Sequence, residues 1–320
     1  KVHQVSYHTL LDDEESVIQV AAGKVLVIDS RALQDESVEE KRRLNAIRHE
    51  LIFRSSAGIR AIVDVGTEKL NFGASGINSG IPGISLKASA YPDTVRSFRA
   101  TITNRFKSNY NTGNLAGYVP GTVHPDSFVV FTAHYDHLGL MGRHNFFPGA
   151  NDNASGVALL ISLADYFQHH PQPYSVVFLA FSGEEAGLLG SGYFADHPPI
   201  KLSSVRFLIN LDLVGTGSEG ITVVNGSIYS EAYADLFAIN EQYRLVEAVR
   251  KRGEACNSDH CSFYRKGVPC FFIYTMGGIK AYHDFDDRPE TLPLTAFEGL
   301  KKLLVLFVST FFNNLPQLPE

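Results

Sequence analysis

In the stretch Phe128-Val-Val-Phe-Thr-Ala-His134-Tyr-Asp136-His137, an apolar run passes directly into imidazole and carboxyl side chains. Residues 128–132 are almost continuously apolar, which is typical of a strand that is buried on both faces of a parallel sheet. In such sheets ligands bind beyond the carboxyl ends of the strands. The stretch therefore predicts a central strand that delivers functional groups at its end.

Further strands and helices alternate on either side of this stretch. Apolar runs predict strands, and amphipathic patterns predict helices. The expected strands are 98–106, 114–119, 174–181, 205–211, 221–224 and 269–274, and the expected helices are 155–167, 186–195, 230–243 and 294–312. This alternation predicts an α/β fold, a three-layer α/β/α sandwich around a mostly parallel mixed sheet, over residues 96–320.

The first third of the chain has a pattern of its own. Expected strands at 24–29 and 58–65 flank an amphipathic helix at 37–53, and an extended segment at 81–85 follows a loop rich in Gly, Ser and Asn. The series resembles a protease-associated domain over about residues 17–91. We expect a small α/β accessory domain at 1–95; the alternative is that these segments are edge pieces of the main fold.

Acidic and imidazole residues recur after the buried strands and near the last helix. Each is an ordinary capping or solvated group when taken singly, and Glu184-Glu185 alone would suit the first turn of a helix. Gathered at one rim, the carboxylates would repel one another unless a cation were present. The residues are His134, Asp136, Asp152, Glu184, Glu185, Asp212 and His283.

This set closely resembles the zinc peptidase family M28, which includes the bacterial secreted leucine aminopeptidases, over residues 114–312. The resemblance implies that His134 and Asp212 bind one metal, Glu185 and His283 bind the other, and Asp152 bridges both. It implies that Asp136 fixes the tautomer of His134 and that Glu184 is the general base. It also implies a cis peptide bond after Asp152.

Each metal would then have three protein ligands and an open position, which is typical of a catalytic site. Nitrogen and oxygen donors suit two Zn²⁺ ions, with cobalt or manganese as substitutes. We expect a metal-dependent aminopeptidase that cleaves peptides with a bridging water activated by the two zinc ions and Glu184. Tyr282, next to His283, is placed to donate a hydrogen bond to the oxyanion.

Three other functions stay open. A carboxypeptidase would need a cation for the terminal carboxylate, and such residues flank the site at Arg265, Lys266, Lys280 and Arg288. A glutaminyl cyclase uses a similar fold with one zinc, and a non-catalytic relative would have lost its ligands.

The same resemblance places residues 257–260 beside the substrate. Phe263, Phe271 and Phe272 either line that pocket or belong to the core, and the core is favoured for the last two. His137 and His260 are expected to support the site rather than to bind metal.

Whole-chain properties exclude some classes of partner. The 320 residues carry a net charge of −6 without a basic stripe, which argues against a nucleic acid. No run of 18 apolar residues occurs, so no membrane span is expected.

The three cysteines leave a Cys256–Cys261 bridge open, and the sequence does not predict the oligomeric state. Because the chain begins at Lys1, we expect an upstream segment to have been removed and, with the family resemblance, an extracellular or periplasmic location.

Overall fold

The computed structural model describes residues 1–53, 57–66, 69–92 and 94–311. The chain forms two compact units, one from residues 1–71 and 75–110 and the other from residues 72–74 and 111–320. The division at Tyr110 lies later than the expected division at residue 95. One reason is that Phe98 packs on the core of the first unit, against the cluster around Val63 and Tyr91.

The first unit is built on a parallel sheet with the strand order β1-β2-β3-β4. Its strands are β1 (Val2–Ser6), β2 (Val25–Asp29), β3 (Ala61–Gly66) and β4 (Gly83–Lys87), and its helices are α1 (Tyr7–Asp12), α2 (Glu14–Ala21) and α3 (Val38–Phe53). Leu26 and Ile28 pack in the same cluster as Leu44 of α3, whereas Val25 and Val27 pack in a second cluster. The strand residues alternate between the faces, so β2 is buried on both sides.

The second unit contains a sheet with the strand order β12-β11-β13-β10-β6-β9-β5. Its strands are β5 (Leu115–Val119), β6 (His124–His134), β9 (Tyr174–Phe181), β10 (Val205–Leu211), β11 (Gly220–Val224), β12 (Val249–Lys251) and β13 (Cys270–Met276). Strands β13, β10, β6 and β9 run parallel, while β5 and β11 pair antiparallel with β9 and β13. The mostly parallel mixed sheet is therefore confirmed.

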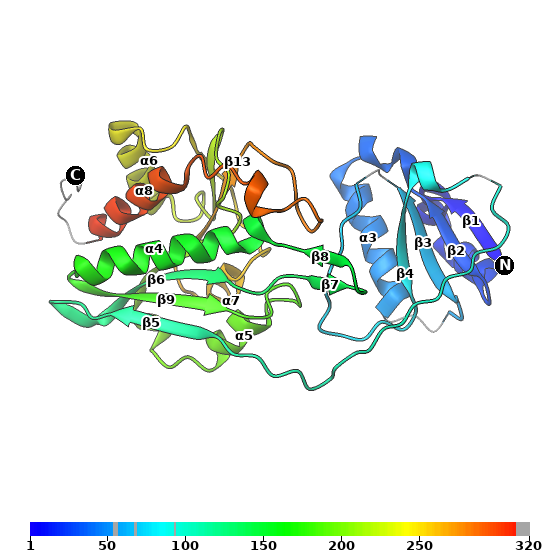
Figure 1. The fold of residues 1–320 in the computed structure, drawn as a ribbon, viewed down its shortest axis with the longest axis horizontal. Helices are drawn as coiled ribbons and strands as arrows, with labels where there is room; N and C mark the ends of the chain where they lie inside the picture. Colours follow the sequence, from blue (N-terminus) through cyan, green and yellow to red (C-terminus); the bar gives the residue numbers. More distant parts are fainter. Residues whose placement is uncertain (54–56, 67–68, 93, 312–320) are drawn as a thin grey trace. The chain divides into compact units, whose positions relative to one another are not determined.

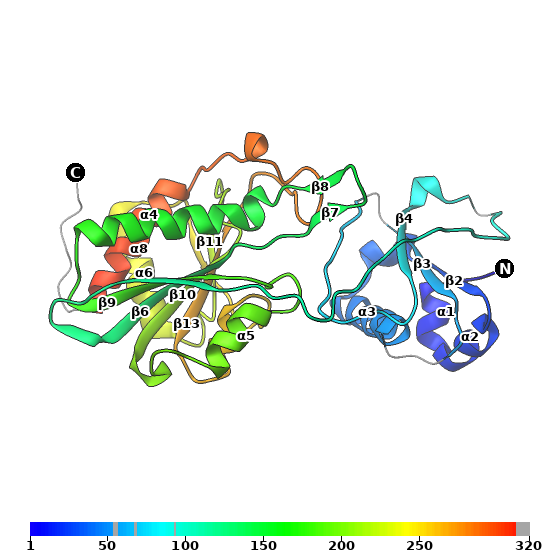
Figure 2. The same ribbon diagram turned by 60° about the horizontal axis from the view of Figure 1, so that its bottom comes forward.

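Helices cover both faces of this sheet (Figures 1 and 2). One layer holds α4 (Ser155–His169), α6 (Ser230–Tyr243) and α8 (Phe297–Thr310), and the other holds α5 (Leu189–Asp196) and α7 (His260–Tyr264). Leu159 and Leu163 of α4 share a core cluster with Phe131 of β6, and Phe194 of α5 packs in a separate cluster with Val177 of β9. These two cores confirm the three-layer sandwich.

One expected strand is absent and several expected boundaries differ from the structure. Residues 98–106 form no strand, because their alternating side chains are mostly exposed and no neighbouring strand pairs with them. Helix α5 begins at Leu189 rather than at residue 186, because Leu188 has a left-handed backbone with φ 60°. Helix α8 begins at Phe297 rather than at residue 294, and the expected end at Phe312 lies outside the described residues.

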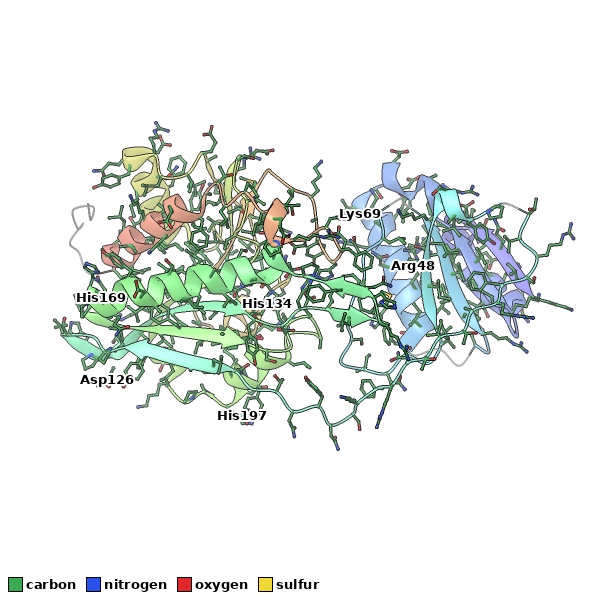
Figure 3. All side chains as sticks on the ribbon, in the orientation of Figure 1. Arg48, Lys69, Asp126, His134, His169 and His197 are labelled. Carbon is green, nitrogen blue, oxygen red and sulfur yellow. A yellow bond between two sulfur atoms is a disulfide. The ribbon has the colours of Figure 1, made fainter. Side chains whose placement is uncertain are left out.

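The parallel strands place their carboxyl ends at one edge of the sheet. His134 is the last residue of β6, Glu184 follows β9, and Asp212 directly follows β10. Figure 3 shows His134 at this end of the second unit, with Asp126 and His169 at the opposite end. A short hairpin of β7 (Gly139–Met141) and β8 (Asn145–Phe147) follows the same strand, β6.

Candidate metal centre

Two carboxylates from separate segments face the imidazole of His134. The Nε2 atom of His134 lies 3.3 Å from Oδ1 of Asp152 and 3.5 Å from Oδ1 of Asp212. Asp152 lies in the turn before α4, so the sheet edge and the start of a helix both contribute. All three side chains are buried.

A second imidazole faces the other oxygen of Asp152. The Nε2 atom of His283 lies 3.1 Å from Oδ2 of Asp152 and 3.1 Å from Oε2 of Glu185. The structure thus brings together the five residues expected to bind metal. The carboxylate of Asp152 presents one oxygen to each histidine, which is the arrangement needed to bridge two cations.

The donor atoms fit divalent cations. Nε2 of His134 is buried and forms no hydrogen bond with any described residue, although two carboxylate oxygens lie within 3.5 Å. Ring nitrogens and carboxylate oxygens that converge without hydrogen bonding one another are typical of a shared metal ion. Imidazole and carboxylate donors without a thiolate suit zinc, cobalt and manganese.

The electrostatics of the cluster also favour a cation. Burial lowers the pKa of His283, but the adjacent carboxylates of Asp152 and Glu185 outweigh this effect and raise the pKa to about 10. The pKa of His134 is likewise raised well above its usual value, because Asp212 and Asp152 outweigh its burial. The carboxylates therefore create a strongly negative potential at both imidazoles.

The carboxylate of Glu184 lies near His134 and Asp212. One oxygen of its carboxylate is within 4.8 Å of donor atoms of both His134 and Asp212. Burial raises the pKa of Glu184 to about 9, although the charge of His134 acts in the opposite direction. The carboxyl group thus lies close to the cluster, where burial increases the affinity of its carboxylate for a proton.

Asp136 has a different contact from the one expected. The backbone oxygen of Asp136 lies 3.1 Å from Nδ1 of His134, whereas its carboxylate is 3.8 Å from that atom. The carboxylate instead accepts hydrogen bonds from the backbone N–H groups of Glu184 and Glu185 at 3.1 and 3.2 Å. Asp136 therefore holds both the imidazole and the turn that carries the two glutamates.

A chain of buried hydrogen bonds leads from β6 to Asp212. The hydroxyl of Thr132 donates to Asn210, the amide of Asn210 donates to the hydroxyl of Ser258, and Ser258 donates to Oδ2 of Asp212 at 2.7 Å. All four side chains are buried. Ser258 lay in the expected pocket segment, but no sequence motif pointed to this contact.

Replacing Ser258 by Ala is expected to weaken zinc binding by about 10- to 100-fold, because Asp212 loses the donor that orients it. The measurement is a competition titration with a chelator. Ser262→Ala is the matched control, since the hydroxyl of Ser262 contacts Ser191 and not a carboxylate. Equal zinc affinities in the two variants would show that Ser258 does not support the site.

The turn that carries Asp152 is held by two other buried side chains. Asp287 accepts from the backbone N–H groups of Asn151 and Asp152 at 2.7 and 3.0 Å. Asn153 donates to the carbonyl of Leu211, next to Asp212. The Asp152–Asn153 peptide bond is cis, as expected.

Two further contacts support Glu185 and His283. Nδ1 of His283 is 3.0 Å from the backbone oxygen of Phe72, a residue of the short segment 72–74 that belongs to this unit. Nδ1 of His137 lies 2.7 Å from Oε1 of Glu185, and the ring is nine-tenths buried. His137 therefore contacts an expected ligand, and its donor atom, together with those of Asp152 and Glu185, also forms a group that could hold a metal ion.

A cavity of about 230 Å³ opens beside the cluster. It is lined by Asp152, Glu184, Asp212, Leu213, Arg252, Asn257, Phe272, Tyr274, Tyr282 and His283. Arg265, Lys266, Lys280 and Arg288, which were expected to flank the site, are not among the residues that line this cavity. Lys266 pairs with Asp196, for example, and Arg288 donates to the carbonyl of Phe285. The cation of this cavity is Arg252, which no motif indicated.

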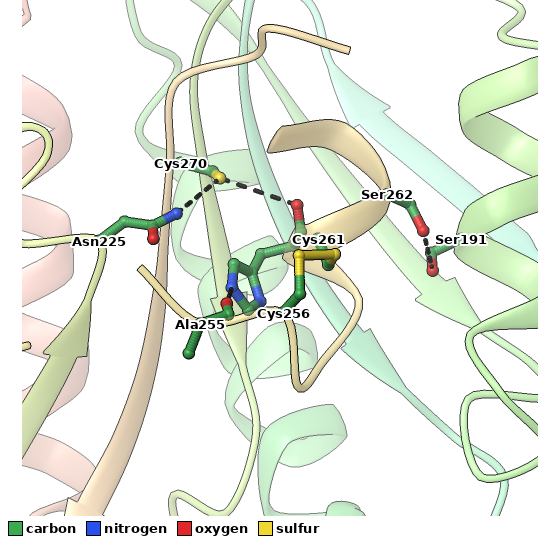
Figure 4. The surroundings of a disulfide bond; sticks show 8 residues. Ser191, Asn225, Ala255, Cys256, Cys261, Ser262 and Cys270 are labelled. Carbon is green, nitrogen blue, oxygen red and sulfur yellow. Dashed lines mark hydrogen bonds between the residues drawn. A yellow bond between two sulfur atoms is a disulfide. The ribbon is translucent and has the colours of Figure 1, made fainter. Parts of the chain in front are cut away.

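The segment before α7 is cross-linked. A disulfide joins Cys256 to Cys261, which resolves the question that the sequence left open (Figure 4). Nε2 of His260 lies 2.7 Å from the carbonyl oxygen of Ala255, so this histidine is hydrogen bonded, as expected. Of the three phenylalanines, Phe263 and Phe271 lie in core clusters, while the expectation that Phe272 is only core is wrong, because it lines the cavity.

Comparisons with known proteins place the chain among peptidases. Residues 114–308 match the family model of peptidase family M28. The aminopeptidase YwaD of Bacillus subtilis (strain 168) is 32% identical over 222 residues, which cover 68% of this chain and 45% of that relative. The chain therefore spans less than half the length of this curated relative.

Solved structures share the fold. The zinc aminopeptidase BSAP from Bacillus subtilis aligns with a TM-score of 0.72 at 23% identity, covering 97% of this chain and 74% of that one. A glutaminyl cyclase from an Acidobacteriales bacterium aligns with a TM-score of 0.53 at 23% identity, over 62% of this chain and 72% of that one. Among the described residues, no helix is long and apolar enough to cross a membrane. The family match covers more than half of the chain, including every residue of the His134–His283 cluster, and the chain belongs to peptidase family M28.

Proposed function

We propose that the protein is a zinc-dependent aminopeptidase. The observation that carries the proposal is the carboxylate of Asp152, whose two oxygens face His134 and His283 at 3.3 and 3.1 Å. With Asp212 beside the first histidine and Glu185 beside the second, the residues offer three donors to each of two zinc ions. Such ions supply Lewis-acid polarisation of a scissile carbonyl and lower the pKa of a water molecule.

Glu184 is the general base in this proposal. Its carboxylate lines the cavity beside His134 and Asp212 without being needed as a ligand. It would take a proton from the attacking water and deliver it to the leaving amine. The backbone N–H of Glu184 is held by Asp136, so the carboxylate is oriented from a fixed turn.

Tyr282 is the oxyanion donor in this proposal. Its ring stacks on His283, with a centroid distance of 4.0 Å, and lines the cavity. Burial and the nearby carboxylates raise the pKa of Tyr282, so that its hydroxyl keeps its proton at neutral pH. The phenol can therefore donate a hydrogen bond to the oxygen on which negative charge develops.

The acidic lining of the cavity favours removal of residues from the N-terminus. Glu184 and Asp212 both line the cavity and suit the ammonium group of a peptide. The similarity to the aminopeptidase YwaD agrees with this direction. The shared fold with a glutaminyl cyclase keeps that activity as the second candidate, but the complete second set of donors at His283 and Glu185 favours two metals.

We further infer that the first unit is a protease-associated domain and that the protein acts outside the cytoplasm, in the extracellular space or the periplasm. The small α/β sheet of the first unit and the disulfide between Cys256 and Cys261 support these two inferences.

A comparison of free and N-acetylated substrates tests the proposed function. The zinc-loaded protein is expected to release the first residue of Leu-Gly-Gly and to leave N-acetyl-Leu-Gly-Gly intact, as followed by chromatography. Cleavage of the acetylated peptide from its C-terminus would instead identify a carboxypeptidase. Cyclisation of an N-terminal glutamine without any hydrolysis would identify a glutaminyl cyclase.

A further inference from the structure

Arg252 is the only arginine or lysine among the described residues that line the cavity. The other charged lining residues are the expected ligands Asp152, Asp212 and His283 and the expected base Glu184. The negative charge of these carboxylates is balanced by the two cations in the proposed function. The guanidinium group of Arg252, an exposed residue, is thus left as an unbalanced positive charge at the cavity.

The backbone around Arg252 is fixed. Its N–H donates to the carbonyl of Val223 at 2.9 Å, and its carbonyl accepts from the N–H of Ser227 at 3.2 Å. The first bond completes the pairing of Lys251 with Val223 at the end of β12, and the second joins Arg252 to the segment after β11. The backbone of Arg252 is therefore anchored by two hydrogen bonds.

The register of the sheet directs Arg252 to the substrate side. Lys251 pairs with Val223, and Val223 pairs with Ile273, so these three residues form one row across the sheet. Side chains in successive rows point to opposite faces. In the next row Val224 pairs with Phe272, and Arg252 follows Lys251 in the chain. Arg252 is therefore on the same face of the sheet as Phe272, which also lines the cavity.

No other charge among the described residues engages this guanidinium. The structure describes no ion pair for Arg252, and the nearest acidic residue in the sequence, Glu254, interacts with Tyr264 instead. An arginine without a counter-ion in a substrate cavity is well suited to bind a carboxylate through two parallel hydrogen bonds.

The place of Arg252 sets the distance at which a carboxylate can bind. Strands β12 and β10 are three steps apart in the sheet, or about 14 Å at the usual strand spacing. Arg252 and Asp212 nevertheless line the same cavity of about 230 Å³, so a substrate that contacts both places its carboxylate close to the scissile bond.

We propose that Arg252 binds a carboxylate of the substrate and makes this peptidase prefer peptides with a negative charge next to the scissile bond. The inference rests on the proposed function. The carboxylate is either the side chain of an N-terminal Glu or Asp, or the free C-terminus of a dipeptide. Both present the same chemistry to the guanidinium.

Matched substrate pairs distinguish the two sources. Glu- and Gln-p-nitroanilide differ only in the side-chain charge and lack a C-terminal carboxylate. Leu-Gly and Leu-Gly-amide differ only in the terminal charge. The zinc-loaded protein is expected to show a higher kcat/KM for the charged member of at least one pair, and that pair identifies the source.

Variants then test the arginine itself. Arg252→Ala is expected to lower kcat/KM for the preferred charged substrate by about 10- to 100-fold and to leave its neutral partner nearly unchanged. Arg252→Lys is expected to retain part of the preference, and Arg252→Glu to shift it toward Lys-p-nitroanilide. The matched control is Arg250→Ala, which removes an exposed arginine of β12 that does not line the cavity.

The outcomes separate this inference from the proposed function. If Arg252→Ala hydrolyses all four substrates with wild-type ratios of kcat/KM, Arg252 does not bind a carboxylate, while the aminopeptidase assignment stands. The same conclusion follows if the wild-type protein has no preference within either pair. If the wild-type protein hydrolyses none of the substrates, the proposed function itself is wrong.

Discussion

Glu184→Gln is expected to lower kcat by about 10²- to 10⁴-fold while both zinc ions remain bound. The amide cannot accept the proton of the attacking water, yet it keeps the size and position of the carboxylate. Glu184 is not needed as a ligand, because His134 already has Asp152 and Asp212 beside it. The measurements are steady-state kinetics on Leu-p-nitroanilide and elemental analysis of zinc.

The neighbouring variant Glu185→Gln provides the contrast. Oε2 of Glu185 lies 3.1 Å from Nε2 of His283, so this change removes an expected ligand and should lower the zinc content as well as the activity. If Glu184→Gln turned over at near the wild-type rate, Glu184 would not be the base. If it lost zinc to the same degree as Glu185→Gln, its role would be that of a ligand.

Asp152→Asn is expected to have the largest effect on metal binding. The carboxylate of Asp152 faces both imidazoles, and a neutral amide offers one oxygen and no negative charge to cations. We expect the zinc content after dialysis to fall from two ions per chain to one or fewer, with loss of most activity. The change should disturb the fold little, since Asn has nearly the same volume.

The matched control for this variant is Asp165→Asn, a change on the exposed face of α4, where the carboxylate lies 3.8 Å from Nδ1 of His169. It should retain two zinc ions and full activity. Retention of two tightly bound zinc ions by Asp152→Asn would rule out a bridging role for this carboxylate.

The sequence predicted the parts of the fold in which the apolar pattern is strong. The continuous apolar runs of β6, β9 and β10 are buried on both faces, and the pattern cannot arise from an exposed strand. The opposite case is residues 98–106, where alternation alone predicted a strand that does not form. Alternation shows which side chains could share a face, but not whether a partner strand is present.

The candidate ligands were predictable for a related reason. Each candidate ligand lies in a sequence motif that resembles the family. His134, Glu184 and Asp212 lie at or just after the carboxyl ends of parallel strands, so the topology gathers them at one edge of the sheet. The sequence also predicted the cis bond after Asp152 through the same resemblance. These residues are close in space because the order of the strands makes them so.

The supporting residues were not predictable, because their roles depend on side-chain directions and not on motifs. Ser258 donates to Asp212 from 46 positions away, and Asp287 holds the backbone of Asp152 from 135 positions away. The proposed role of Arg252 depends on the pairing of β12 with β11. The sequence pattern did not indicate β12, which is a short strand. A single sequence carries no sign of such distant pairings.

Anomalous scattering from crystals of the zinc-loaded protein, collected on both sides of the zinc absorption edge, locates the metal ions. A bridging Asp152 should give two peaks about 3.5–4 Å apart, one beside His134 and Asp212 and the other beside His283 and Glu185. A single peak, or peaks bound by other residues while Asp152 contacts neither, would contradict this bridging role.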